Sequence, residues 1–135
     1  MKNTLLITAI QKAKNGLALH PELAYFPHWT FIVQNNKVLS IGRNRSGATH
    51  KHFGYDKDKN NKIGYYVPKY HSEADAIRRC RFTLNNGFEA INIRLNRLGE
   101  LKLSYPCKTC YSLLHWLGCG KIYFSTESGW GDIRL

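Results

Sequence analysis

Apolar residues recur at helical spacing close to the N-terminus of the chain. Six apolar side chains share one face of a helix over residues 4–18: Leu5, Leu6, Ala9, Ile10, Ala13 and Leu17. The sequence His20-Pro21 interrupts this period, because proline cannot donate the backbone hydrogen bond that a helix requires. The pattern therefore predicts a first helix over residues 4–18.

A β-hairpin is predicted next. Residues 29–34 and 38–41 are rich in β-branched and aromatic side chains, which suit a half-buried strand. Between them, Asn35-Asn36-Lys37 has the composition of a tight turn. The two runs are therefore expected to pair with each other.

Further strands are predicted in the second half of the chain. Residues 88–95 have the alternating pattern of a strand, which places three apolar side chains on one face: Ile91, Ile93 and Leu95. Residues 101–103 form a short strand, and residues 121–125 form a final apolar strand. The tail that follows, residues 126–135, is short and rich in glycine.

Two more helices separate these strands. Residues 72–84 have an inner face of mixed character, and Asn85-Asn86-Gly87 ends that helix. Residues 106–117 form the third helix, with Pro106 at the favoured first-turn position. Strands that alternate with helices predict an α/β fold in which helices cover both faces of a sheet.

Length and composition fit one domain spanning residues 1–135. No apolar run approaches the roughly 20 residues that a membrane span needs, and the apolar start is too short for a secretion signal, so we expect a cytoplasmic protein. In that compartment four cysteines indicate a metal site or buried thiols rather than disulfides.

The chain is strongly basic, with a formal net charge of +11. This charge favours anionic partners such as nucleotides or nucleic acid. Much of the excess lies between Lys37 and Arg81, where 11 basic and 4 acidic residues occur. Within this range, residues 42–70 show no periodicity and lead directly to the candidate chemistry. A loop of this length is typically functional or disordered.

Two short motifs suggest a catalytic metal site. His71-Ser72-Glu73 stands at the start of the second predicted helix, and the cysteine pair Cys107 and Cys110 at the start of the third. Zinc favours thiolate and imidazole ligands, and two cysteines three residues apart share one helical face. The positive end of the helix dipole favours their thiolates. Glu73 stays available to move protons beside metal-activated water.

The pairing of H-x-E with P-C-x-x-C is the signature of zinc-dependent nucleobase deaminases. On these motifs, and on Lys121-Ile-Tyr-Phe-Ser125 after them, the sequence resembles the cytidine/deoxycytidylate deaminase superfamily over residues 31–125. The resemblance implies a three-layer α/β/α cytidine-deaminase-like fold with a mixed central sheet. It implies zinc on His71, Cys107 and Cys110, and Glu73 as the catalytic proton shuttle.

The expected reaction is hydrolytic deamination of cytosine in a nucleoside or nucleotide, with release of ammonia. By the same resemblance, Asn44 holds the sugar of the substrate, and the chain around Ser72, Pro106 and Cys107 contacts the base. The resemblance also implies that the protein self-associates. Ser72 replaces the commoner alanine of the family. Because only ten residues follow Ser125, we expect the fifth strand of the family to be short or absent.

Two alternatives remain open at this point. The enzyme could edit cytosine or adenine within single-stranded DNA or RNA, binding the strand through residues 42–70; the compact length favours the small substrate instead. The second alternative is a non-enzymatic zinc knuckle that binds nucleic acid. It would use Cys107, Cys110, His115 and Cys119 as ligands.

Overall fold

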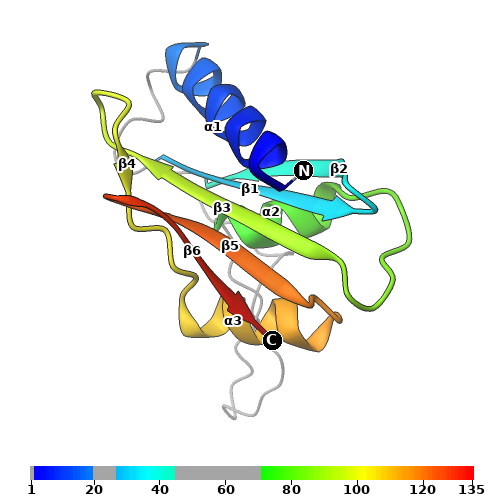
Figure 1. Ribbon diagram of the computed structural model, residues 1–135. Helices are drawn as coiled ribbons and strands as arrows, with labels where there is room; N and C mark the ends of the chain where they lie inside the picture. Colours follow the sequence, from blue (N-terminus) through cyan, green and yellow to red (C-terminus); the bar gives the residue numbers. More distant parts are fainter. Residues whose placement is uncertain (1, 20–26, 45–70) are drawn as a thin grey trace, which may run out of the picture.

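The computed structural model describes residues 2–19, 27–44 and 71–135. In these ranges, three helices and six strands follow one another along the chain. They are α1 (Lys2–Leu19), β1 (His28–Gln34), β2 (Lys37–Arg43), α2 (Ser72–Arg79), β3 (Glu89–Leu95), β4 (Leu101–Lys102), α3 (Lys108–Trp116), β5 (Lys121–Thr126) and β6 (Gly129–Arg134). The strands form one sheet in the order β2-β1-β3-β5-β6, and β4 pairs with β3 (Figure 1).

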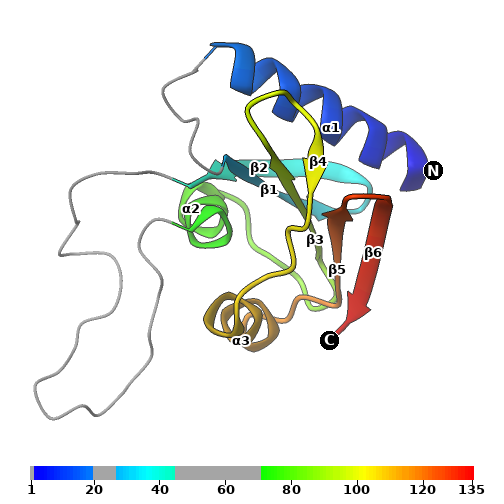
Figure 2. The same cartoon turned by 90° about the vertical axis from the view of Figure 1, so that its left-hand side faces the viewer.

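The sheet is mixed, and helices cover both of its faces. Only β3 and β5 are parallel; the other pairings are antiparallel. Helix α1 lies on one face, while α2 and α3 lie side by side on the other (Figure 2). The predicted three-layer α/β/α arrangement is therefore confirmed.

Alternation along the central strands divides the core into two clusters. On the α1 side, Phe31 of β1 packs with Ile91 and Ile93 of β3. On the other side, Ile32 of β1 packs with Ile122 of β5. All five side chains are at most 1% exposed, and burying each one stabilises the fold by roughly 1.5–3 kcal/mol. The three residues predicted to share one face of β3 therefore all belong to the core on the α1 side.

Helix α1 matches its predicted range to within two residues. Leu6, Ala9 and Ala13 are buried against the sheet, as the helical spacing of apolar residues predicted, while Lys12 and Lys14 are exposed. Within the described ranges, none of the helices has both the length and the apolar character needed to cross a membrane.

The β1–β2 hairpin turns on two residues. Asn35 and Asn36 have φ angles of 53° and 63°. Asparagine tolerates this left-handed region, and two such residues in succession match the twist of paired strands. Lys37 is already the first residue of β2, so the predicted hairpin is confirmed with a turn one residue shorter.

Helix α2 is shorter than predicted. It ends at Arg79, and Cys80 has an extended backbone with φ −74° and ψ 122°, so the extension of the helix to residue 84 was wrong. The side chain of Gln34, at the end of β1, donates to the carbonyl of Thr83 and accepts from the backbone N–H of Asn85. These two hydrogen bonds hold the chain in an extended path toward β3.

The C-terminal tail forms a full strand. Strand β6 pairs antiparallel with β5 over six residue pairs, from Lys121↔Arg134 to Thr126↔Gly129. The expectation that the last strand would be short or absent was therefore wrong. Gly131 lies opposite Phe124, where a Cβ atom would stand 2.5 Å from the ring. Glycine at this position of β6 therefore leaves room for the Phe124 side chain, and the glycine-rich composition does not prevent the strand from forming.

Helix α3 begins two residues later than predicted. Cys107 is the N-cap, with an extended backbone, and its sulfur accepts a hydrogen bond from the N–H of Cys110. Pro106 therefore precedes the N-cap instead of occupying the first turn. This places the cysteine pair directly at the helix N-terminus.

Candidate metal centre

Three potential metal ligands meet between the N-termini of α2 and α3. The ligand atoms of His71, Cys107 and Cys110 all lie within 4.8 Å of one another. His71 is the N-cap of α2, and the cysteines occupy the N-cap and the first turn of α3. Residues about 36 positions apart in the chain are brought together because the two helices lie on the same face of the sheet.

The spacing of these atoms fits a tetrahedral zinc ion. Zn–N bonds of about 2.0–2.1 Å and Zn–S bonds of about 2.3 Å place nitrogen and sulfur about 3.6 Å apart around a tetrahedral ion. The His71 Nδ1 atom lies 3.3 Å from the Cys110 sulfur and 3.5 Å from the Cys107 sulfur. One imidazole and two thiolates suit zinc, and three protein ligands leave a fourth position for water or substrate.

The electrostatics of the site favour a bound cation. Cys110 is fully buried, and burial, followed by the nearby charges of Glu73 and Cys107, raises the pKa of its thiol well above the ordinary value. The ionised sulfur that a metal needs is therefore stable only beside positive charge. A divalent cation supplies that charge, and the N-terminus of α3 contributes in the same direction.

A cavity of about 230 Å³ opens beside the three ligands. Its lining comes from the starts of β1, α2 and α3 and from the end of β2: His28, Asn44, His71, Ser72, Glu73, Tyr105 and Cys107. The volume lies below the roughly 300–1,000 Å³ of pockets that hold drug-sized ligands. It suits one small ring of a ligand rather than the whole of a large one.

Glu73 lies inside this cavity without belonging to the ligand group. Its side chain is only 5% exposed, and its Oε2 atom accepts a hydrogen bond of 2.8 Å from the Nδ2 of Asn92. Its Oε1 atom accepts a longer hydrogen bond, 3.4 Å, from the Ser72 hydroxyl, and the carboxylate also lies close to the Cys110 thiol. One carboxylate oxygen is thus held firmly by Asn92, and the other is held less tightly beside the cavity.

The sequence analysis missed the residues that hold Glu73. Asn92 accepts a 2.7 Å hydrogen bond from Thr30, which also bonds the Ser72 hydroxyl at 2.7 Å. Asn92 and Thr30 are both buried. A signal was present, because Asn92 interrupts the apolar run of β3, and a buried amide must find partners. The alternation of β3 places it on the face toward α2, where Glu73 is the partner.

Asn44, the residue assigned to the sugar by the resemblance, lines the cavity. Its Oδ1 atom accepts from the backbone N–H of His28 at 2.9 Å, and its own N–H donates to the His28 carbonyl at 3.2 Å. Ser72 also lines the cavity. Pro106 is buried next to Cys107 and is not among the residues that line the cavity.

His28 and Tyr105 are two lining residues that the sequence did not single out. Burial, and then the positive charges of Arg94 and His71, lower the pKa of His28 to about 4. His28 is therefore a neutral hydrogen-bonding group at pH 7. Tyr105 packs edge-on against Phe124, with ring centroids 5.1 Å apart, and remains half exposed at the cavity mouth.

The zinc-knuckle alternative does not match the positions of its ligands. In the described part of the chain, His71, Cys107 and Cys110 form the one group of three or more potential ligands that meet. Cys119 packs in the core on the α2–α3 side, and its thiol donates to the carbonyl of Lys121. His115 lies exposed on α3. Neither residue joins the cysteine pair.

No protein-family model matches this chain, and no curated protein sequence matches it. Of the basic stretch predicted to bind a strand, residues 45–70 lie outside the described residues. The chemistry of the protein must therefore be inferred from the geometry of the metal centre and its cavity.

Proposed function

We propose that this protein is a zinc-dependent hydrolase that deaminates a cytosine base in a nucleoside or nucleotide. One observation supports this most strongly: a buried carboxylate, Glu73, faces a small cavity beside three metal ligands and is not itself a ligand. A structural zinc site needs no such carboxylate, whereas hydrolysis at a metal requires a group that moves protons.

The proton transfers are assigned to Glu73. A zinc ion on His71, Cys107 and Cys110 would supply Lewis acidity, which lowers the pKa of water from near 16 to about 7. The Oε1 atom of Glu73 accepts a proton from the attacking water and delivers it to the ring nitrogen of the base. It then transfers the second proton to the departing amino group. Water and cytosine become uracil and ammonia, and Glu73 returns to its ionised form.

The other cavity residues would hold the base and its sugar. Ser72 and Tyr105 bound the space for one ring, and neutral His28 offers a hydrogen bond without attracting charge. Asn44 lies at the same opening, where the resemblance to cytidine deaminases assigns it to the sugar.

Deamination of cytosine or adenine within a single strand is the second candidate, supported by the net charge of +11. Mass spectrometry separates it from the first. The zinc-loaded protein is incubated in parallel with deoxycytidylate and with a single-stranded oligonucleotide that contains cytosine and adenine. Uracil from the mononucleotide supports the first candidate, and uracil or hypoxanthine in the oligonucleotide alone supports the second. No conversion of either substrate would overturn both.

A further inference from the structure

A second, larger cavity lies around the edge strand β2, outside the metal centre. It is a groove of about 340 Å³ between α1, the β1–β2 hairpin and α2. Its lining contains Lys12, Gly16, Leu19, Trp29, Phe31, Ile41, Gly42, Arg43, Asp75 and Arg79. None of these residues lines the metal-site cavity.

The groove has an apolar floor. Trp29 and Phe31 of β1 belong to the α1-side core, and Ile41 of β2 is 39% exposed beside them. Gly16 of α1 packs against the edge of the indole, where a Cβ would stand 3.1 Å from its Nε1 atom, and Trp29 is only 4% exposed. The exposed apolar surface of the groove comes from Ile41 and from Leu19 of α1, which is 74% exposed, and it suits an apolar group of a ligand.

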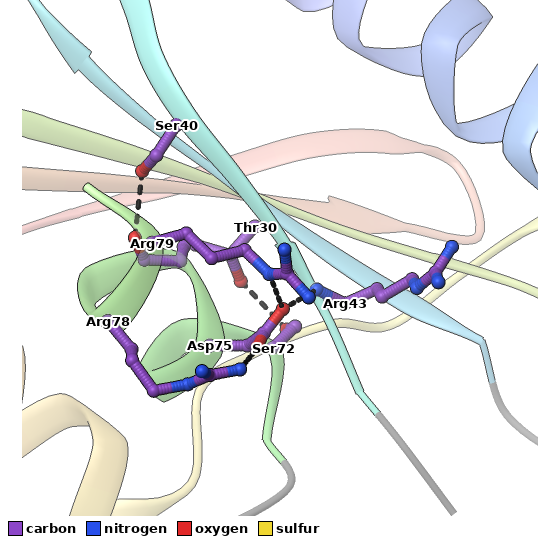
Figure 3. A network of polar contacts seen from close by, with 8 residues as sticks. Thr30, Ser40, Arg43, Ser72, Asp75, Arg78 and Arg79 are labelled. Carbon is purple, nitrogen blue, oxygen red and sulfur yellow. Dashed lines mark hydrogen bonds and ion pairs between the residues drawn. The ribbon is translucent and has the colours of Figure 1, made fainter. Parts of the chain in front are cut away.

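The rim of the groove is cationic: Lys12 from α1, Arg43 from β2 and Arg79 from α2. Within the part of the chain that the structure describes, the Lys12 ammonium and the Arg43 guanidinium form no ion pair. Arg43 uses its backbone N–H, not its side chain, to bind Asp75 at 3.0 Å, and Figure 3 shows the side chain extending away from that carboxylate.

The single acid in the lining already has its partners. Asp75 is 3% exposed and accepts from Arg78 and from the Nε of Arg79, both at 2.8 Å, in addition to the Arg43 backbone (Figure 3). Arg79 uses only its Nε in this contact, so its terminal nitrogens remain for another acceptor. The groove therefore keeps a net positive charge with unused donors.

We propose that this groove binds a phosphate group of a nucleotide, through Lys12, Arg43 and Arg79, with the apolar floor beneath its base or sugar. Arginine matches the geometry of phosphate, and lysine adds a point charge. The groove and the metal-site cavity are lined by neighbouring residues at the same end of the hairpin: Arg43 precedes Asn44 in the chain, and Trp29 follows His28. The ligand class rests on the proposed function; the site rests on the residues of the groove.

Such a phosphate has two sources, which share the same chemistry. It belongs either to a strand whose reacting base occupies the metal-site cavity or to a separate mononucleotide. For a strand, the logarithm of the binding constant should fall linearly with the logarithm of the salt concentration, with a slope of about −0.7 per phosphate contact. A mononucleotide should bind without reaching the metal site.

The first measurement is fluorescence anisotropy with labelled oligothymidine of ten nucleotides, across a salt series. Arg43→Gln and Lys12→Gln are each expected to weaken binding by roughly three- to tenfold and to reduce the salt slope by about 0.7. The matched control is Arg134→Gln, which removes the same charge from β6 at the opposite edge of the sheet. Equal binding by all three variants would refute the groove as the site that holds a phosphate of a strand.

The second measurement follows the Trp29 indole N–H by nuclear magnetic resonance while pyrophosphate, thymidine monophosphate or oligothymidine is added. Movement of this signal with the oligonucleotide alone supports the strand. Movement with the monophosphate or pyrophosphate supports a separate small ligand. No movement with any of them, together with no effect of Arg43→Gln on anisotropy, overturns the proposal.

The outcome does not depend on deamination. Oligothymidine contains no amino group to release, so binding is measured without turnover. If Arg43→Gln weakens binding but the unmodified protein never deaminates any substrate, the groove stands and the proposed function fails. If cytosine is deaminated while Arg43→Gln binds like Arg134→Gln and none of the probes moves the Trp29 signal, the proposed function stands and the groove fails.

Discussion

Among single residues, Glu73 has the most specific task in the proposed reaction, because it must accept protons close to the metal without binding the metal. Replacing Glu73 by glutamine keeps the shape of the side chain and removes its ability to accept a proton. Turnover of the cytosine substrate is expected to fall by at least about 100-fold, while zinc content stays at that of the original protein.

Initial rates and elemental analysis of the purified variant test this expectation. Glu127→Gln is the matched control, since Glu127 is exposed in the turn between β5 and β6, outside the cavity. A Glu73→Gln protein with nearly unchanged turnover would refute the assigned proton transfers.

Substitutions of the two buried cysteines on the α2–α3 side should distinguish a metal ligand from a residue that only packs in the core. Cys110→Ala should lose most of its bound zinc, because only two ligands remain. Cys119→Ala removes a thiol of the same size from the adjacent core and should keep its zinc. Zinc per chain, measured after dialysis, distinguishes the two variants. Equal zinc content in both would contradict the ligand assignment.

Asn92 is expected to position Glu73 rather than to touch the substrate. Asn92→Leu preserves the volume but removes the donor to Glu73 and the acceptor for Thr30. Buried groups left without partners cost about 1–3 kcal/mol each, so the free energy of unfolding should fall by that order. A loose carboxylate should lower kcat and leave KM nearly unchanged. A variant that loses stability but keeps kcat would show a structural role only.

The potential metal ligands and Glu73 could be singled out from the sequence because their spacing is local: His71 and Glu73 are two positions apart, and the two cysteines are three positions apart. The structure confirms that His71, Cys107 and Cys110 lie close enough together to hold a metal ion. Asn92 and Thr30 could not be found in this way. Their significance depends on which face of the sheet carries α2, and that face is decided by contacts between distant segments.

Among the secondary-structure elements, α2 depends most on its close approach to β2. A Cβ at Gly42 would lie 2.1 Å from the Ala76 nitrogen and 2.5 Å from the Ser72 carbonyl oxygen, so helix and strand meet backbone to backbone. Ser40 strengthens this contact by donating to the Ala76 carbonyl at 2.8 Å (Figure 3).

Gly42→Ala should therefore displace α2, and with it His71 and Glu73. We expect a loss of about 1–3 kcal/mol in the free energy of unfolding, together with weaker zinc binding. Gly131→Ala is the matched control, because its Cβ would strike the Phe124 ring at β5 and β6, toward the edge of the sheet opposite to β2. That variant should lose stability without weakening zinc binding. Denaturant titration and zinc competition assays measure the two effects separately.

Elements with regular apolar spacing were predicted well, and elements decided by neighbours were not. Helix α1 and strand β3 follow their patterns closely. The early end of α2 depends on Gln34, which lies in another element. Strand β6 depends on pairing with β5, where Gly131 accommodates Phe124. A single sequence window contains neither of these contacts.

In the molecule as a whole, a metal ion would connect two helices that otherwise meet mainly through the sheet. Removing it with a chelator is expected to lower the melting temperature, because a ligand at about 100 times its Kd stabilises the native state by about 2.7 kcal/mol. For a chain of this size that corresponds to several degrees. The Cys110→Ala variant is the control and should melt at the same temperature with and without chelator.

The difference in stability between the metal-bound and the metal-free protein should widen from pH 7 to pH 9. Burial raises the pKa of Cys110, so the metal-free folded chain keeps the thiol protonated where the unfolded chain begins to ionise it near pH 9. The unfolded state then binds fewer protons, and the free energy of unfolding falls as pH rises. The metal-bound chain holds a thiolate already and escapes this loss. Calorimetry at both pH values tests the trend; a constant difference would contradict it.

The parallel pairing of β3 with β5 also sets the order in which the site can form. His71 precedes β3 in the chain, whereas both cysteines follow it and lead into β5. The three ligands can meet only after this long-range crossover has closed, and such contacts form late because loop closure costs entropy before pairing rewards it. A nascent chain would hold a metal with two cysteines at most. Occupation of all three ligands is therefore expected to mark a chain in which this crossover has formed.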